Sequence, residues 1–308
     1  VKLRRGRRRN IGGVFILVKI VIVGGGVSGW ISALLFPIRQ PDHEYVIVES
    51  PEVKTIGVGE GTTGFFTSHV ISKYFNITIE EFLRETKATP KIGIEFNNWN
   101  RIGSTYFNPI DGSITKSESF YSALYYTYTK NSKLDNSSLH GLMRGINKSP
   151  FYKSSGELKY YDTALHLDNE LAIKYLKKKA LKAKNLSYIS DTVSKIIRKQ
   201  NGDVEKIICE TNTIEGDIFI DCTGFARIFS DKSDWISFKE NLPMNSVTTF
   251  TRKHSKDIDM VTKANALSSG WCWEIPTQDR IGCGYVNCDG FINQEDVEKE
   301  IKLNYPDA

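Results

Sequence analysis

The segment KIVIVGGGVSGW, residues 19–30, decides the fold of this chain. Its β-branched run over 20–23 is typical of a buried parallel strand. Gly24, Gly26 and Gly29 then give the spacing G-x-G-x-x-G, which permits a tight turn, the approach of a pyrophosphate to the backbone, and close packing of a helix on the strand. From Trp30, WISALLF continues as an apolar helix whose first amides would face phosphates. The segment predicts a dinucleotide-binding βαβ unit, with a plain α/β turn as the alternative.

A second apolar strand, EYVIVE, ends at Glu49, twenty residues beyond Gly29. An acidic residue at this spacing accepts a hydrogen bond from a ribose 2′-hydroxyl, which favours FAD or NAD over NADP. A third strand, GDIFIDCTG, places Asp221 and Gly224 at its end. In flavoproteins of the glutathione-reductase-like type, such a late strand returns beneath the cofactor, and a nicotinamide dehydrogenase needs no such strand. We therefore predict FAD, bound by Asp221 and Gly224 together with Glu49 and the fingerprint residues.

The composition excludes several other classes of protein. The chain has 308 residues, of which 40% are hydrophobic and 25% charged, so it is neither disordered nor fibrous. Six of its basic residues lie in the first ten, and taking them from the net charge of +5 leaves −1 for residues 11–308. Only these first ten residues have the excess of positive charge that binding to nucleic acid would require. We expect the lysines of a predicted helix over 168–185 to be a solvated face, and YISDTVSKIIRKQNGDVEKIICET to form a meander that turns at Asn201-Gly202.

The cysteine pattern and the N-terminal segment together predict in which cellular compartment the protein lies. The five cysteines include no C-x-x-C pair, and the histidines do not lie at metal-ligand spacing beside them, so we expect no metal site and no disulfide framework. Lys19 interrupts the apolar run after the basic stub, and no small-x-small cleavage site follows, which argues against a signal peptide. No stretch is long and apolar enough for a membrane span. We predict a cytoplasmic protein without a membrane partner.

Three motifs in chain order resemble those of the flavin-dependent tryptophan halogenases, over most of residues 19–290. The first is the fingerprint ending in Gly29-Trp30, and the second is the loop GVGEGTT, residues 57–63. The third and most specific is WCWEIP, residues 271–276, which matches the W-x-W-x-I-P signature of the family. Two weaker matches are Lys91, where the family has its catalytic lysine, and His166-Leu167-Asp168, ahead of a helix.

The residue patterns can also be read without the resemblance. In KIGIEF, alternation places Ile92, Ile94 and Phe96 on one face and Lys91, Gly93 and Glu95 on the other, where Gly93 would leave room for a ligand. From spacing alone, a solvated strand lysine is favoured. Trp271, Trp273 and Ile275 share one face of a strand that turns at 277–280 and returns as IGCGYV. Without the resemblance, these three side chains would be an ordinary aromatic stripe in the core. The alternative is that they form a barrier beside the substrate.

The resemblance implies an enzyme that uses FADH2, O2 and halide (chloride or bromide) to halogenate an electron-rich aromatic such as tryptophan or another indole. It implies Lys91 as the catalytic residue that orients the halogenating species. The loop residues Gly59, Glu60, Gly61 and Thr62 would lie at the flavin, and Trp271, Trp273, Ile275 and Pro276 would separate the substrate from it. Because no second nucleotide motif appears, a separate NAD(P)H-dependent flavin reductase would supply FADH2. A homodimer stays open.

The sequence also departs from the family. Gly61 replaces the usual alanine of the loop, and Pro90 precedes the lysine where an aromatic residue is usual. The chains of the family continue beyond the position of Ala308, and the glutamate that partners the lysine lies in that later region. Although Glu95 lies near Lys91 in the sequence, the resemblance does not assign it the role of this glutamate. We therefore expect a C-terminally incomplete chain. An FAD-dependent aromatic monooxygenase and an inactive flavin-binding fragment are the competing interpretations.

The predicted fold class is α/β, with a glutathione-reductase-like, Rossmann-type FAD-binding domain interleaved with a β-sheet substrate domain. Residues 1–18 would be a basic extension. We place the FAD part at about 19–75 and 155–230, and the substrate part at about 76–154 and 231–308. Residues 101–150, rich in Ser, Asn and Tyr, would form loops near the substrate.

Overall fold

The computed structural model describes residues 17–55, 57–110, 138–230, 235–254 and 257–308. The chain divides into two units, each assembled from two stretches of sequence. Unit 1 comprises residues 1–54 and 176–230, and unit 2 comprises 55–175 and 231–308. The boundaries thus fall at 54/55, 175/176 and 230/231. We had placed the first two near 75/76 and 154/155 and the third at about 230/231. The assignment of a cofactor part and a substrate part stays a prediction.

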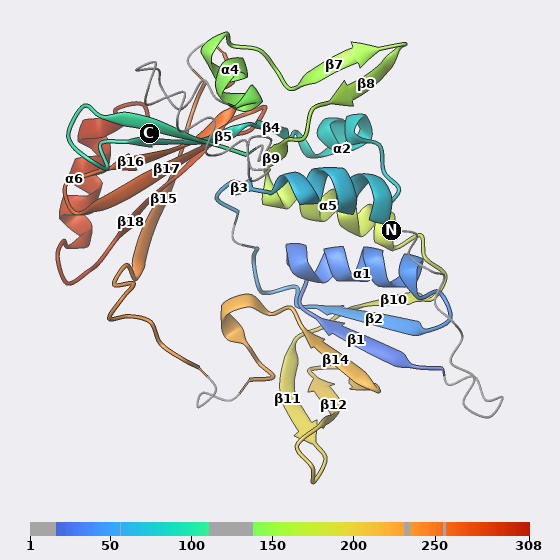
Figure 1. Ribbon diagram of the computed structural model, residues 1–308. Coiled ribbons are helices and arrows are strands. Elements are labelled where there is room, and N and C mark those ends of the chain that lie inside the picture. The colour runs from blue at the N-terminus through green and yellow to red at the C-terminus, as the bar shows by residue number, and fades with distance from the viewer. Residues whose placement is uncertain (1–16, 56, 111–137, 231–234, 255–256) are drawn as a thin grey trace, which may run out of the picture. The chain divides into compact units, whose positions relative to one another are not determined.

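Unit 1 is built on a parallel sheet in the order β10-β2-β1-β14 (Figure 1). Its strands are β1 (Lys19–Val23), β2 (Glu44–Glu49), β10 (Leu186–Ser190) and β14 (Ile218–Asp221). The β-branched run predicted this burial correctly, since residues 21–23 and 45–48 are all buried. Helix α1 (Val27–Arg39) follows β1 and buries Trp30, Ala33 and Leu34. The predicted strand–glycine turn–helix arrangement is confirmed.

A second sheet of unit 1 is antiparallel, in the order β11-β12-β13. It comprises β11 (Val193–Arg198), β12 (Val204–Cys209) and β13 (Thr213–Glu215), and Gly202 turns the first hairpin with φ +91°. Its Ile207, Cys209 and Ile214 pack in one core with Val21, Val23, Val46 and Val48 of the parallel sheet. The predicted meander therefore holds from β11 onward, whereas its first strand, β10, joins the parallel sheet because it pairs with β2.

Unit 2 is built on a six-stranded sheet in the order β15-β18-β17-β16-β5-β6. Its strands are β5 (Gly93–Asn97), β6 (Thr105–Pro109), β15 (Ser246–Arg252), β16 (Val261–Ala266), β17 (Gly270–Pro276) and β18 (Ile281–Asn287). Thr277 N–H donates to the Arg280 carbonyl at 2.9 Å, which closes the predicted turn between β17 and β18. Helix α6 (Gln294–Asn304) packs Val297 and Ile301 against Tyr285 of this sheet.

Two smaller sheets belong to the same unit. The sheet β3-β9-β4 comprises β3 (Glu60–Gly61), β4 (Thr89–Lys91) and β9 (Ala164–Leu167), and a hairpin is formed by β7 (Phe151–Ser154) and β8 (Glu157–Tyr160). The other helices that lie wholly or partly in this unit are α2 (Ile79–Thr86), α4 (Leu139–Gly145), α5 (Asn169–Ala180) and the π-helix η1 (Phe66–Tyr74). Asp168 caps α5, because its Oδ1 accepts from Leu171 N at 3.2 Å. The boundary between the units lies within α5.

The structure corrects two expectations about unit 2. KIGIEF is not one strand, because Lys91 ends β4 in the small sheet and Gly93 begins β5 in the large one. The backbone of Ile92 turns between them, donating to Met260 O and accepting from Ile110 N at 2.9 Å each. Residues 101–150 are not all loop, since β6 and α4 lie within them. The rest of that prediction, at 111–137, lies outside the described residues, as does the basic extension apart from 17–18.

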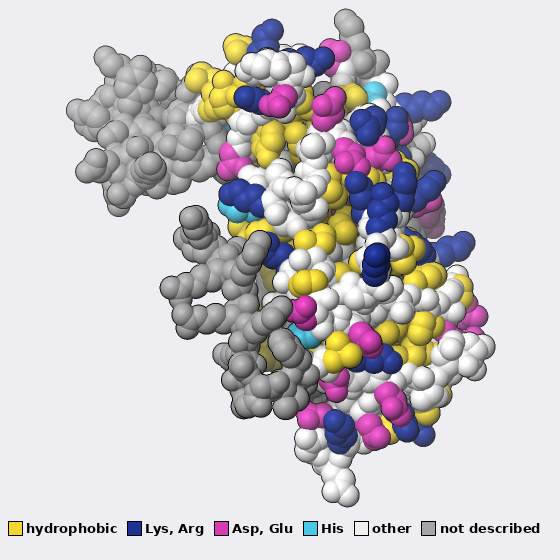
Figure 2. All heavy atoms as spheres, turned by 90° about the vertical axis from the view of Figure 1, so that its right-hand side faces the viewer, with side chains coloured by type: hydrophobic (Ala, Val, Ile, Leu, Met, Phe, Trp, Pro, Cys, Tyr) yellow, Lys and Arg dark blue, Asp and Glu magenta, His cyan; other side chains and the backbone are white. Residues whose placement is uncertain are grey.

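Charged side chains of both signs lie on the surface of the described residues. On the face shown in Figure 2, basic side chains lie among acidic and hydrophobic ones. The lysines at 174 and 178 on α5 are exposed, as the predicted solvated face requires, whereas Lys177 and Lys179 are half-buried. Across the described residues, no helix is both long enough and apolar enough to cross a membrane.

Candidate functional site

The three fingerprint glycines of unit 1 meet three different steric demands. Gly24 has φ +119°, and a Cβ there would overlap the Cys222 carbonyl, so the turn requires glycine. A Cβ on Gly29 would overlap the Gly24 carbonyl, because helix α1 lies close against the turn. Gly26, at the N-cap of α1, has open space where its Cβ would be. The two outer glycines serve packing, and the middle one leaves the first amides of the helix open to an approaching phosphate.

Glu49, at the end of β2, accepts hydrogen bonds from three side chains of unit 1. Trp30 Nε1 donates to its Oε1 at 3.3 Å, while Lys177 Nζ and Tyr188 OH donate to its Oε2 at 2.5 and 2.9 Å. Lys177 Nζ also lies 4.1 Å from the centroid of the Tyr188 ring. This network fixes the carboxylate at the strand end where a ribose would be recognised. Lys177 and Tyr188 carried no sequence signal for this role, because α5 and β10 meet β2 only through the fold.

Asp221 and Gly224 lie at the end of β14, beside the fingerprint turn. Asp221 pairs in register with Val23, the last residue of β1. Its Oδ1 accepts from Thr223 N at 2.9 Å and from Thr223 Oγ1 at 2.6 Å, and its Oδ2 accepts from Phe229 N at 3.0 Å. Gly224 has φ +62° and open space at its Cβ position. All the cofactor residues predicted for unit 1 therefore gather at the carboxyl edge of the parallel sheet, where open α/β sheets bind ligands.

Lys91 of unit 2 is buried on the small sheet, with only 8% of its surface exposed. Loss of hydration lowers the pKa of its amine below the ordinary lysine value. The amine nitrogen lies close to Gly61 of β3, since a Cβ built on Gly61 would be 2.5 Å from it. The solvated lysine favoured by spacing alone is therefore wrong for Lys91. The structure instead joins Lys91 to the loop over 57–63.

His166, in the middle strand of the same sheet, is completely buried and neutral. Burial is the larger cause and the positive charge of Lys91 the smaller one, and together they lower its pKa to about 3. Thr89 Oγ1 donates to the Pro276 carbonyl at 2.6 Å, so it accepts from His166 Nδ1 at 3.3 Å. His166 Nε2 consequently accepts from Thr262 Oγ1 at 2.9 Å. A single tautomer thus joins four strands around Lys91 without a second charge, and neither threonine had been identified from sequence.

The loop residues have distinct environments. Gly59 has φ +86°, and its Cβ position lies 3.2 Å from Ile275. Thr62 is paired with Leu165 through its backbone amide at 2.8 Å and its hydroxyl at 2.9 Å. Glu60 accepts from Asn169 Nδ2 at 2.8 Å, and burial raises its pKa although that hydrogen bond opposes the shift. The loop therefore combines a constrained backbone with one carboxyl group that holds its proton more tightly than usual.

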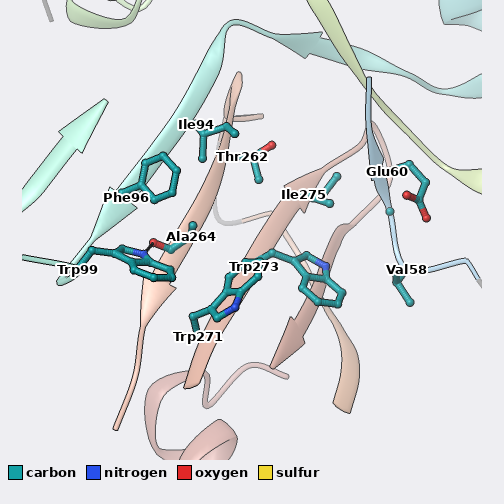
Figure 3. A pocket seen from close by; sticks show the side chains of 11 residues that line it. Val58, Glu60, Ile94, Phe96, Trp99, Thr262, Ala264, Trp271, Trp273 and Ile275 are labelled. Carbon is teal, nitrogen blue, oxygen red and sulfur yellow. Dashed lines mark hydrogen bonds between the residues drawn. The ribbon is translucent and has the colours of Figure 1, made fainter. Parts of the chain in front are cut away.

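An aromatic pocket of about 420 Å³ opens beside this loop (Figure 3). Trp271, Trp273 and Ile275 of β17 all line it, as their alternation predicted. The remaining lining residues are Val58, Gly59, Glu60, Ile94, Phe96, Trp99, Thr262 and Ala264. Trp273 Nε1 is buried and has no hydrogen-bond partner among the described residues. The stripe is therefore the wall of a cavity that suits a flat apolar ligand.

Other predicted residues stand differently toward this pocket. Pro276 is not one of the described residues that line the pocket. Its carbonyl instead accepts a hydrogen bond from Thr89 Oγ1. The room expected at Gly93 is filled, because a Cβ there would overlap the Phe107 ring and lie 2.6 Å from the Asn108 carbonyl. Glu95 is engaged by Arg144. Trp99 and Phe96 were visible in the sequence next to Lys91, whereas Thr262 and Ala264 reach the pocket only because β16 pairs with β5.

The described residues contain no cluster of side chains suited to a metal ion. The five cysteines are free thiols. Burial raises the pKa of Cys272 to about 11 and also raises the pKa of Cys222. The raised pKa makes the Cys272 and Cys222 thiols poor nucleophiles.

Together, these features define an α/β protein with the fold of dinucleotide-binding proteins, a buried lysine and a pocket lined by indole rings. The model of the tryptophan halogenase family matches residues 19–308, so the chain belongs to that family. Tryptophan 7-halogenase RebH of Lentzea aerocolonigenes is 28% identical to it over 314 residues, which cover 92% of this chain and 58% of RebH. The family and the fold class predicted from the motifs are confirmed.

Solved structures agree with this assignment. Tar14, a tryptophan C-6 flavin-dependent halogenase from taromycin biosynthesis, superposes with a TM-score of 0.85 at 26% identity, over 94% of this chain and 61% of Tar14. A tryptophan halogenase from Shewanella frigidimarina gives a TM-score of 0.83 at 26% identity, over 95% of this chain and 60% of that one. The chain spans about three-fifths of the length of these relatives.

Proposed function

We propose that this chain is a flavin-dependent halogenase that uses FADH2, O2 and chloride or bromide to halogenate an electron-rich aromatic of the indole class. The observation that carries the proposal is the buried Lys91 amine beside the loop over 57–63, which itself borders the pocket walled by Trp271 and Trp273. The names of relatives such as RebH, a tryptophan 7-halogenase, support an indole substrate.

The residues of unit 1 fit the dinucleotide part of FAD. The open Gly26 position at the start of α1 would receive the pyrophosphate, and the fixed Glu49 carboxylate would accept a ribose hydroxyl. Asp221 and Gly224 would lie at the same sheet edge. When bound and reduced, the flavin supplies a hypohalous acid from oxygen and halide. The contacts of the loop residues Gly59, Glu60, Gly61 and Thr62 with the flavin stay a prediction.

Lys91 would orient the halogen toward the aromatic substrate. As an ammonium group it would donate hydrogen bonds to the oxygen of the hypohalous acid. As a free amine it would take the halogen on nitrogen, the halogen–oxygen bond would break, and the hydroxide would leave as water with a proton from the nitrogen. Burial favours the free amine because it lowers the pKa of the group. The neutral His166 beside it adds no competing charge. This environment gives the lysine access to both forms nearer to neutral pH than a solvated lysine has.

The indole wall would keep the substrate apart from the flavin. Trp271, Trp273 and Ile275 present one continuous apolar surface to the pocket, and Gly284 lies against the Trp273 ring where a side chain would overlap it. A wall of this kind blocks the direct transfer of oxygen to the substrate while a small oxidant passes. We further propose that a separate NAD(P)H-dependent flavin reductase supplies FADH2.

The test is a reaction with FADH2, oxygen, bromide and a panel of indoles, analysed by mass spectrometry. We expect a brominated product that Lys91→Ala abolishes while the oxidation of the flavin continues. Lys148→Ala, which removes an exposed lysine of the same unit, should leave bromination unchanged. Oxygen incorporation that does not depend on halide would instead show a monooxygenase. Flavin binding without any product would show an inactive flavin-binding chain.

A further inference from the structure

Three tryptophans of unit 2 contact one another in a line beside the pocket (Figure 3). The ring centroids of Trp273 and Trp271 are 6.0 Å apart, and those of Trp271 and Trp99 are also 6.0 Å apart. The ring planes of the two pairs are tilted by 59° and 53°. These distances are typical of aromatic rings in direct contact, so each indole is the immediate neighbour of the next.

Trp99 bridges a gap that the sheet itself would leave. It follows β5, whereas Trp271 lies on β17, and β16 separates these two strands. Strands two places apart in a sheet lie roughly 10 Å from each other. Trp99 Nε1 donates to the carbonyl of Ala264 on β16 at 2.9 Å, and the small Ala264 side chain leaves room for the indole. This hydrogen bond holds the Trp99 ring over β16 and against Trp271.

The two ends of the line differ in their access to water. Trp273 is half-buried, and its Nε1 atom is buried without a hydrogen-bond partner among the described residues. Trp99 is 44% exposed. An indole that loses one electron becomes a radical cation, and a buried charge costs more free energy than a hydrated one. A positive charge formed on Trp273 is therefore more stable after it has moved to Trp99.

We propose that Trp273, Trp271 and Trp99 form an electron-transfer relay that carries oxidising equivalents from the pocket to the surface. A one-electron oxidant in the pocket takes an electron from Trp273 and is reduced. Trp273 regains an electron from Trp271, and Trp271 regains one from Trp99. Trp99 regains its electron from a thiol in solution, which releases a proton, and two of the resulting sulfur radicals join as a disulfide.

The relay ends at Trp99. Phe96 contacts this indole from another side, with 6.0 Å between the ring centroids. A phenyl ring is much harder to oxidise than an indole, so the charge does not pass to Phe96. Such a relay would protect the indoles of the pocket from oxidative damage. That benefit rests on the proposed halogenase function, whereas the electron transfer depends only on the three rings.

The test oxidises the chain with azide radicals, generated by radiolysis, and locates oxidised tryptophans by peptide mass spectrometry. In the unaltered protein we expect the damage to concentrate at Trp99. In Trp99→Phe, the damage at Trp271 and Trp273 should rise several-fold, because the charge can no longer leave them. If the rings react independently, the substitution would leave the damage at Trp271 and Trp273 unchanged, and this result would overturn the proposal.

Trp99→Tyr separates the loss of the relay from the loss of a covering side chain. Tyrosine and phenylalanine fill nearly the same space, but a phenol is readily oxidised. Trp99→Tyr should therefore keep the damage at Trp271 and Trp273 close to that of the unaltered protein. Equal damage in the two variants would mean that the smaller ring only exposes Trp271, which contradicts the relay. Trp30, fully buried in unit 1, is the internal reference and should not change.

The repair step is measured by the absorbance of the tryptophan radical after the pulse. Glutathione is present at a concentration too low to compete with the protein for azide radicals. The radical should decay faster in the unaltered protein than in Trp99→Phe, since its charge then lies on an exposed ring. Equal decay rates would show that the charge does not reach Trp99.

Neither measurement requires the chain to halogenate. If the damage and decay follow the relay but no halogenated product forms, the proposed function fails and the relay stands. If a halogenated product forms while the three indoles are damaged independently, the relay fails and the proposed function stands.

Discussion

Lys177 Nζ donates to Glu49 Oε2 at 2.5 Å and ties α5 to the end of β2. The same carboxylate accepts from Trp30 on its other oxygen, so two elements hold it in one orientation. A carboxylate held in this way meets a ribose hydroxyl without first losing rotational freedom. The pairing thus explains how a residue remote in sequence contributes to the predicted dinucleotide site.

The first prediction concerns this pairing. Lys177→Met removes the charge but keeps much of the side-chain length, and it should weaken FAD binding by about 10-fold, which corresponds to ~1.4 kcal/mol. Quenching of flavin fluorescence during titration measures the change. Lys178→Met, at the exposed neighbouring position, is the control and should bind FAD like the unaltered protein. Equal weakening by both variants would point to net charge and not to the orientation of Glu49.

The second prediction separates two glycines of the fingerprint. Gly29→Ala should destabilise unit 1 by more than ~2 kcal/mol, because its Cβ would overlap the Gly24 carbonyl. Gly26→Ala meets open space and should reduce stability by about 1 kcal/mol or less, yet weaken FAD binding, because the new methyl group obstructs the helix start. Urea unfolding and flavin titration measure the two effects. The reverse order of stabilities would contradict the assigned roles.

The contrast between these glycines shows what a sequence pattern can reveal. The turn, the buried strand and the apolar helix depend on neighbours within a few residues, so the segment over 19–39 was predictable. The strand containing Lys91 was not, since alternation continues through Ile92 while the hydrogen-bond partners change from β9 to β16 and β6. Which sheet a strand joins depends on distant segments, and so the threonine contacts of His166 could not be anticipated.

The third prediction concerns pH and His166. In the folded protein the pKa of His166 is about 3, so the side chain stays neutral above that pH, whereas an unfolded histidine takes up its proton near pH 6.5. Between these values the unfolded state binds more protons, so the free energy of unfolding falls as the pH is lowered, by up to about 1.4 kcal/mol per pH unit from this group. His166→Gln should lose that contribution to the slope. Denaturant unfolding at several pH values measures it, with His254→Gln as a control. Parallel slopes for His166→Gln and the unaltered protein would contradict the buried neutral state.

The last prediction decides between two interpretations of Gly93. Room for a ligand would let Gly93→Ala fold normally and impair only binding, whereas the structure places the Phe107 ring and the Asn108 carbonyl where the new methyl group would go. We therefore expect Gly93→Ala to destabilise unit 2 by about 1–3 kcal/mol, the usual range for overpacking. Phe107→Leu in the same chain should recover part of that loss, since the smaller side chain relieves the overlap. Thermal unfolding of the single and double variants measures both effects. Full stability of Gly93→Ala would restore the ligand interpretation.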